Sequence, residues 1–242
     1  MRLYLFNILK NKMLLLFILE LLFFLTCAIF LLGFIVSISL KKYKYRASNK
    51  MKWFLLVWNI MLINPVWAGF NEAVANFQRG SYEFALREFK FLAQQGNITA
   101  QYNLAYMYAK GLGINQNYEQ AFKWFSSAAQ RGDAESQFHL AGMYEHGLGV
   151  NQNYMRAVAW YQKAAERGVA AAQVSLGGLY GIGLGVTKND IQAYTWFSLA
   201  AEQGDVYASE AEVLLATNMS VQETEQAEMN AQKIAKKYTT LR

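Results

Sequence analysis

The chain has 242 residues and a formal net charge of +6, with one cysteine, two histidines and one proline. The cysteine is Cys27, so the rest of the chain can form neither an internal disulfide nor a cysteine-based metal site. This shortage of nucleophiles and metal ligands argues against most hydrolases and metalloenzymes, and the composition favours a helical, alanine-rich fold.

The positive charge is concentrated at the start of the chain. Residues 1–68 hold nine lysines and arginines against Glu20 alone, a net charge of +8, which leaves −2 for residues 69–242. Because the basic excess belongs to a hydrophobic leader and its flanks, we expect no nucleic-acid partner.

Residues 1–50 are predicted to hold a transmembrane helix and its basic flank. From Met13 to Leu40 the sequence is almost unbroken apolar, with Glu20 as the only charge. At a rise of about 1.5 Å per residue, this run is long enough to cross a hydrocarbon core of about 30 Å.

Residues 51–68 have the pattern of a secretory signal peptide. A basic start precedes an apolar run, and Val66 and Ala68 stand at the −3 and −1 positions of a cleavage site. Two histories remain open: initiation at Met51 with an exported product, or a start at Met1 with two membrane segments retained. In both, the basic residues between the segments stay in the cytoplasm. We therefore expect a membrane-anchored or exported protein whose remaining residues are periplasmic or extracellular.

Residues 69–99 are predicted to form a shorter, tetratricopeptide-like repeat. Tyr82, Ala85 and Phe89 match positions of the second helix in the units that follow, but the long glycine turn of those units is absent.

The next part of the chain repeats with a period of 36, in the units 100–135, 136–171 and 172–207. The units share a ladder of leucine, tyrosine, glycine, alanine and tryptophan: Leu104, Leu140, Leu176; Tyr108, Tyr144, Tyr180; Gly113, Gly149, Gly185; Ala121, Ala157, Ala193; Trp124, Trp160, Trp196.

Each unit is predicted to fold as two helices. In the first unit, Tyr102, Ala105 and Tyr108 follow a helical period. Gly111 is expected to end this helix in the left-handed conformation, and Asn117 to cap the second helix. One helix pair cannot bury its own apolar face, so the units must stack into an all-α superhelix.

Residues 208–242 are predicted to form C-terminal capping helices. Ser220 and Glu223 make a capping box that opens a last helix reaching Tyr238. The Glu, Gln and Lys content of this helix suits the polar end of a solenoid.

The pattern A-x-Y/F-x-L-A/G-x-M/L-Y, followed in each unit by G-x-G-V/I, A-x-x-W and A-A-x-x-G, resembles the Sel-one-like repeat (SLR) family, a branch of the tetratricopeptide-type α-solenoids. The resemblance covers residues 69–242. It implies a non-enzymatic adaptor that scaffolds or binds other proteins, often in the secretory pathway, the bacterial envelope or at host contact.

By analogy with tetratricopeptide packing, the first helix of each unit lines the inner curve of the superhelix. The positions that vary between units are expected to face solvent there: Tyr102, Tyr106, Ala109, Lys110; Phe138, Gly142, Glu145, His146; Val174, Gly178, Gly181, Ile182. From these we predict six partner-binding residues: Tyr102, Tyr106, Lys110, Phe138, Glu145 and His146. This aromatic surface with few charges suits an extended peptide or an amphipathic helix. Tyr102 and Phe138 equally fit a place in the core.

No catalytic residue, metal site or cofactor is predicted. His139 and His146 lie about 10 Å apart along one helix, too far to chelate one metal without a third ligand, and are interpreted as surface residues. The glycine-rich run from Gly181 to Gly185 is interpreted as a turn between helices, because no strand precedes it as a phosphate loop requires.

The leading hypothesis is a protein–protein interaction adaptor or scaffold of the bacterial envelope, with its partner on the concave face. The alternative is an envelope factor that acts on peptidoglycan or another glycan and needs two convergent carboxylates. Glu135 and Glu145 are the candidate pair, but ten residues along one helix separate them by about 15 Å, beyond the roughly 5–9.5 Å of glycosidases. Self-association of the chain through its repeats is a third hypothesis.

Overall fold

The computed structural model describes residues 69–239 of the chain. The predicted membrane helix within residues 1–50 and the signal-peptide-like segment 51–68 lie outside the described residues. Across residues 69–239, no helix combines the length and the apolar character that crossing a bilayer requires.

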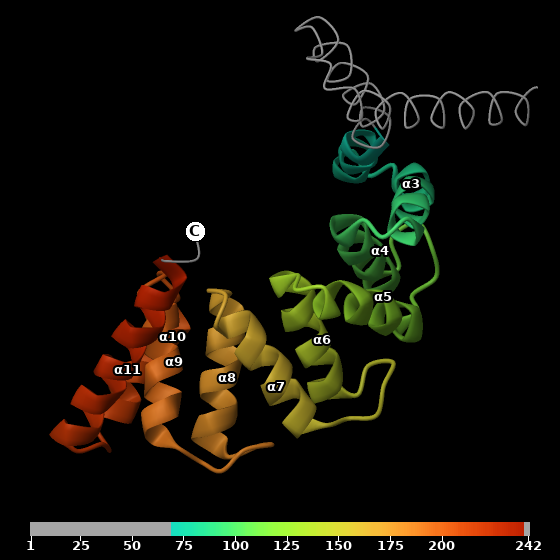
Figure 1. Cartoon of the computed structure of the whole chain (residues 1–242). Coiled ribbons are helices and arrows are strands. Elements are labelled where there is room, and N and C mark those ends of the chain that lie inside the picture. Colours follow the sequence, from blue (N-terminus) through green and yellow to red (C-terminus); the bar gives the residue numbers. More distant parts are fainter. Residues whose placement is uncertain (1–68, 240–242) are drawn as a thin grey trace, which may run out of the picture. The chain divides into compact units, whose positions relative to one another are not determined.

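The described residues form a succession of α-helices, and no strand occurs among them (Figure 1). The prediction of an all-α repeat fold is confirmed for this part of the chain. A helical segment over residues 69–78 is followed by α3 (Tyr82–Gln94), α4 (Ile98–Lys110), α5 (Tyr118–Gln130), α6 (Ala134–His146), α7 (Tyr154–Ala165), α8 (Ala170–Ile182), α9 (Asp190–Ala201), α10 (Val206–Ala216) and α11 (Val221–Thr239).

Three consecutive helix pairs form the repeats. α4 packs against α5, α6 against α7 and α8 against α9, and the second helix of each pair also packs against the first helix of the next. The pairs begin at Ile98, Ala134 and Ala170. Each start lies two residues before that of the predicted unit, and the spacing of 36 is kept.

The ends of the helices follow the predicted turn chemistry. α4, α6 and α8 each end at a glycine in the left-handed conformation, and Gly111 has a φ of 71°. The side chain of Asn117 accepts a hydrogen bond from the backbone N–H of Gln120 and so caps α5. An asparagine caps α7 and α9 in the same way.

A second glycine in each turn touches the preceding helix pair. Gly149 has a φ of 69°, and a Cβ atom there would overlap the backbone of Tyr118 at the start of α5. The equivalent glycines of the other two turns make the same approach to Tyr82 and Tyr154. The glycine ladder is therefore a contact between repeats as well as a turn.

Alanines allow the helices to approach closely, and aromatic rings fill the remaining space. Ala121, Ala157 and Ala193 are completely buried at the same position of α5, α7 and α9. Phe125 and Tyr161 lie in the same apolar cluster and are 2% and 3% exposed. Small residues facing large ones give the core its close packing.

A buried glutamine ties the first helix of each repeat to the helix before it. Gln101 donates its side-chain N–H to the backbone carbonyl of Ala93, and Gln137 donates to that of Ala129, both at 3.1 Å. The third repeat makes the same bond at 3.2 Å. Each of these carbonyls also accepts the backbone N–H of the glycine three residues later, so the glutamine adds a second hydrogen bond at the end of the preceding helix.

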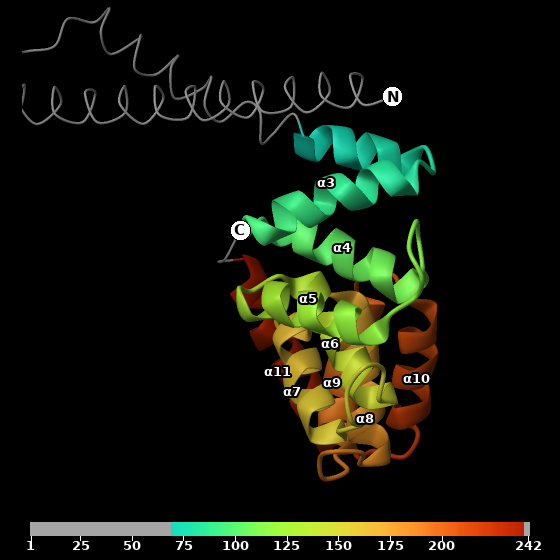
Figure 2. The ribbon, with the colours of Figure 1, turned by 90° about the vertical axis from the view of Figure 1, so that its right-hand side faces the viewer.

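The C-terminal helices depart from the pairwise pattern. α11 packs against α9 rather than against α10, so that α9 lies between them (Figure 2). α11 begins at the predicted capping box, in which the backbone N–H of Ser220 donates to the carboxylate of Glu223 at 2.8 Å. Within α10, Ala208 alone is buried. The helix exposes four large apolar side chains: Val206, Tyr207, Val213 and Leu214.

Candidate functional site

A cavity of about 460 Å³ opens between α4 and α6, and α5, α7 and α8 complete its walls. We call this cavity the groove. Ala109 and Gly142, two of the variable positions on these helices, line it. Five of the six predicted partner-binding residues also line it: Tyr106, Lys110, Phe138, Glu145 and His146.

Tyr102, the sixth predicted residue, stands beside the groove and supports its wall. Its ring stacks on that of Tyr106 with 6.4 Å between centroids, and it meets the ring of Phe125 edge-on at 5.9 Å. Burial raises the pKa of Tyr102, and the charge of Glu135 raises it further. The half-buried Tyr102 therefore holds the lining ring of Tyr106 in place.

The predicted positions on α8 are not among the lining residues: Val174, Gly178, Gly181 and Ile182. Val174 packs instead against a separate apolar cluster that contains Phe197. Ile182 is 71% exposed. The residue that α8 contributes to the groove is Ser175.

His139, interpreted from the sequence as a surface residue, is partly buried against aromatic rings of the preceding helix pair. Its ring stacks on that of Phe125 with 4.9 Å between centroids, and lies 5.7 Å from the ring of Tyr102. α6 turns this position toward the preceding helix pair, which the spacing in the sequence does not reveal. Burial lowers the pKa of His139, and the charge of Lys110 lowers it further. The neutral imidazole therefore acts as one of the aromatic rings of the groove.

Tyr161 of α7 holds the carboxylate of Glu145. The Tyr161 hydroxyl donates a hydrogen bond to Oε2 of Glu145 at 2.6 Å. Burial, and then the hydrogen bond and charge of Glu145, raise the pKa of Tyr161 well above its ordinary value. The hydroxyl therefore keeps its proton, and the carboxylate lines the groove in a fixed orientation.

The groove is largely aromatic and carries few charges. Of the described residues that line it, Lys110 and Glu145 alone have a formal charge with the histidines neutral. Lys110 and His146 are exposed. No group of three or more His, Cys, Asp or Glu side chains within residues 69–239 is arranged to hold a metal ion. Apolar walls with one cation and one oriented anion suit the recognition of peptide side chains.

Sequence reasoning missed seven of the residues that line the groove: Tyr118, Phe125, His139, Met143, Leu148, Tyr161 and Ser175. Phe125 and Tyr161 occupy the same position of the second helix, directly after the shared tryptophan, and the pattern places them in the core. They are core residues by burial, and they also line the cavity. Their position next to Trp124 and Trp160 was the available signal, but a buried ladder position does not reveal that a cavity lies beside it.

The comparisons with known proteins agree with this geometry. The Sel1 repeat family model matches residues 98–133, 134–169 and 170–205, which are the three helix pairs described above. A Sel1 repeat protein from Oxalobacter formigenes is 34% identical with a TM-score of 0.60, over 68% of this chain and 70% of that one.

A protective antigen present in uropathogenic Escherichia coli strains, which displays an SLR fold, is 34% identical over 64% of this chain with a TM-score of 0.61. The matched region spans 33% of the length of that antigen. No curated protein matches the chain. Sel1 repeat proteins generally mediate protein–protein interactions. On the matched repeats and the shared fold, the chain belongs to the Sel1 repeat family.

Proposed function

We propose that this chain is a non-enzymatic scaffold of the bacterial envelope, and that it binds a peptide segment of a protein partner in the groove between α4 and α6. The observation that carries the proposal is the oriented carboxylate of Glu145 within a largely aromatic cavity. A buried tyrosine that fixes an acceptor in an open cavity prepares that acceptor for a ligand.

The chemistry of the groove favours a peptide with an apolar or aromatic side chain beside a cationic one. Tyr106, Phe138 and His139 offer ring surfaces to the first of these side chains. Glu145 accepts a charge-assisted hydrogen bond from the second. Because Tyr161 already orients the carboxylate, binding costs Glu145 little side-chain entropy.

A peptide library displayed on phage and panned on the full-length chain tests this proposal. We expect enrichment of peptides with a lysine or arginine close to an aromatic or aliphatic residue. Glu145→Lys and Tyr106→Ala should each lower the affinity for the enriched peptides by about tenfold or more, as the loss of an interface anchor does. Phe84→Ala is the matched control, because Phe84 on α3 is a 57% exposed aromatic outside the groove.

Two outcomes would contradict the proposal. One is the enrichment of peptides that bind Glu145→Lys as tightly as the parent chain, and the other is no enrichment at all. Far-UV circular dichroism of each variant checks that the helices are kept.

The envelope location rests on residues 1–68, where basic charge and long apolar runs are combined. Fusions of alkaline phosphatase and of a fluorescent cytoplasmic reporter after residue 100 test it. We expect phosphatase activity without fluorescence. Fluorescence without phosphatase activity would overturn the location and leave the groove proposal standing.

A further inference from the structure

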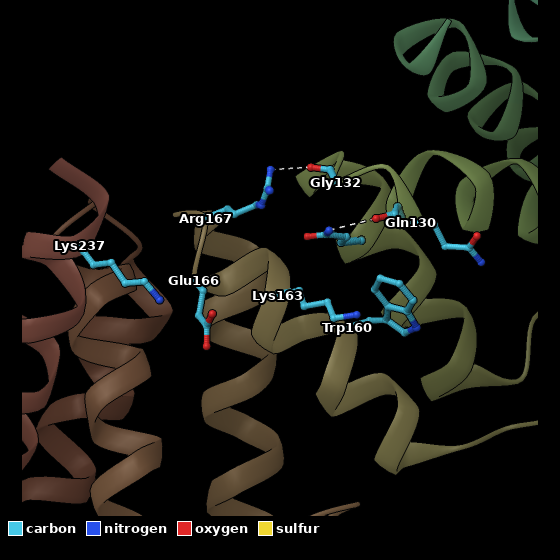
Figure 3. Close-up of a pocket in the computed structure, with 9 residues that line it drawn as sticks. Gln130, Gly132, Trp160, Lys163, Glu166, Arg167 and Lys237 are labelled. Atoms are coloured by element: carbon cyan, nitrogen blue, oxygen red, sulfur yellow. Dashed lines mark hydrogen bonds between the residues drawn. The ribbon is translucent and has the colours of Figure 1, made fainter. Parts of the chain in front are cut away.

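A second cavity, of about 470 Å³, lies outside the groove (Figure 3). The end of α5, the start of α6, α7 and α11 form its walls. Three cations line it, Lys163, Arg167 and Lys237, against one carboxylate, Glu166. Glu166 accepts a hydrogen bond from Gln162 at 3.0 Å. The cavity therefore has a net positive charge.

A buried acceptor without a partner also lines this cavity. Gln137 is 5% exposed, and its side-chain N–H donates to the carbonyl of Ala129. Its Oε1 atom is buried and has no hydrogen-bond donor among the described residues. An unsatisfied buried acceptor costs about 1–3 kcal/mol, so its occurrence in a cavity wall points to a donor that comes from outside.

The flanking repeats show what Gln137 lacks. In the first repeat, Oε1 of Gln101 accepts a hydrogen bond from the hydroxyl of Ser127 at 3.1 Å. In the third repeat, Oε1 of Gln173 accepts one from the amide of Gln203 at 2.7 Å. Both equivalents of Gln137 are thus satisfied by the protein itself.

In the middle repeat, both of these donor positions hold cations that point elsewhere. Lys163 occupies the position equivalent to Ser127, and its ammonium lies 3.8 Å from the centre of the Trp160 ring. Arg167 replaces Gln203 and donates to the carbonyl of Gly132 at 2.6 Å, as Figure 3 shows. The middle repeat therefore lacks the internal donor of its neighbours. It also has a cation at both positions, whereas the first repeat has Ser127 and Arg131 there and the third has Leu199 and Gln203.

We propose that this cavity binds a small hydroxylated anion, namely a sugar acid or a sugar phosphate. A ligand hydroxyl donates to Oε1 of Gln137, and the carboxylate or phosphate accepts from Lys163 and Arg167. Trp160, which is half-buried in the wall, offers apolar surface to the ring of the sugar. This site is separate from the groove and does not depend on the proposed function.

Isothermal titration of the full-length chain with glucuronate, glucose 6-phosphate, glucose and inorganic phosphate tests the proposal. We expect binding of at least one of the two sugar anions with a Kd below about 1 mM. Neutral glucose and inorganic phosphate should bind at least about tenfold more weakly, because each lacks one of the two required groups. Comparison of the two sugar anions identifies whether a carboxylate or a phosphate is preferred.

Two variants restore the neighbouring repeats' own chemistry and so keep the fold. Lys163→Ser recreates the pair of Ser127 with Gln101, and Arg167→Gln recreates that of Gln203 with Gln173. Each variant should lower the affinity for the sugar anion by about tenfold or more without lowering Tm. Arg131→Gln makes the same change as Arg167→Gln at the equivalent position of the first repeat and should bind like the parent chain.

Four results would overturn the proposal. They are the absence of measurable binding by both sugar anions, equal affinity for inorganic phosphate, unchanged affinity in Lys163→Ser, and tighter binding of a short peptide through its terminal carboxylate. Because Glu145→Lys lies in the groove, it should leave the affinity for the sugar anion unchanged.

Discussion

The hydroxyl of Tyr161 and the carboxylate of Glu145 are joined by a hydrogen bond of 2.6 Å that links α7 to α6 across the wall of the groove. Tyr161 is 3% exposed, so its hydroxyl is satisfied by protein groups such as Glu145 rather than by bulk water. The pair therefore contributes to stability as well as to the shape of the cavity.

Tyr161→Phe is expected to lower the free energy of unfolding by about 1–2 kcal/mol, because a partly buried hydrogen bond to a charged acceptor is lost. Urea denaturation followed by circular dichroism measures the change. Tyr154→Phe is the control, since the Tyr154 hydroxyl makes an exposed bond with Gln152 and its loss should cost less than about 0.5 kcal/mol. Equal effects of the two substitutions would show that the bond with Glu145 adds no stability.

Gly149→Ala is expected to destabilise the chain by about 3 kcal/mol or more. A Cβ atom at this position overlaps the backbone of Tyr118, and its φ of 69° is unfavourable for alanine. Gly168→Ala has a comparable φ of 87° but meets no atom within 4 Å, so it should cost only about 1–2 kcal/mol. The difference between the two midpoints of urea denaturation measures the contact between repeats. The same loss in both variants would assign the whole effect to the turn.

His139 makes stability depend on pH. Burial lowers its pKa below the ordinary value of 6.5, so between the folded and unfolded pKa values the unfolded chain binds more protons. The contribution of His139 is therefore present above about pH 6.5 and is lost as the pH falls below it. His139→Asn, which copies Asn103 of the first repeat, should lose less stability between pH 7.5 and pH 5 than the parent chain. Urea denaturation at each pH measures the difference. Parallel plots of the free energy of unfolding against pH for the two proteins would contradict this prediction.

Gln101→Met is expected to cost about 1–3 kcal/mol, although methionine is apolar and of similar length. The substitution removes the donor to the carbonyl of Ala93 and the acceptor of Ser127, both at buried or partly buried atoms. Gln130→Met, on the exposed side of α5, should change the free energy of unfolding by less than about 0.5 kcal/mol. A loss of unfolding free energy at position 101 no larger than at position 130 would show that the hydrogen bonds of Gln101 add no stability.

Much of the fold was predictable because its signals are local. Gly111 and Asn117 act through their own turn chemistry, and the period of 36 states directly how many helix pairs stack. The groove was predictable in outline, since Tyr106 and Glu145 stand at positions that vary while the ladder is kept.

The remaining features depend on contacts between distant parts of the chain. His139 reads as a surface residue until Phe125 of the preceding pair is placed against it. The unsatisfied Oε1 of Gln137 is visible only when the directions of Lys163 and Arg167 are known. No spacing in the sequence reports such directions.

The course of α11 affects how the array unfolds. In a simple solenoid each repeat contacts only its neighbours, so the structure can fray inward one unit at a time. Here Ile234 packs against an apolar cluster that reaches back to Ala105 of the first repeat, and Lys237 lines a cavity together with Gln130. The last helix thus packs on α9 and also lines a cavity with residues of the first two repeats. Removal of α11 would therefore also destabilise repeats that are distant in the sequence. The intact repeats are expected to unfold cooperatively rather than one after another from the end.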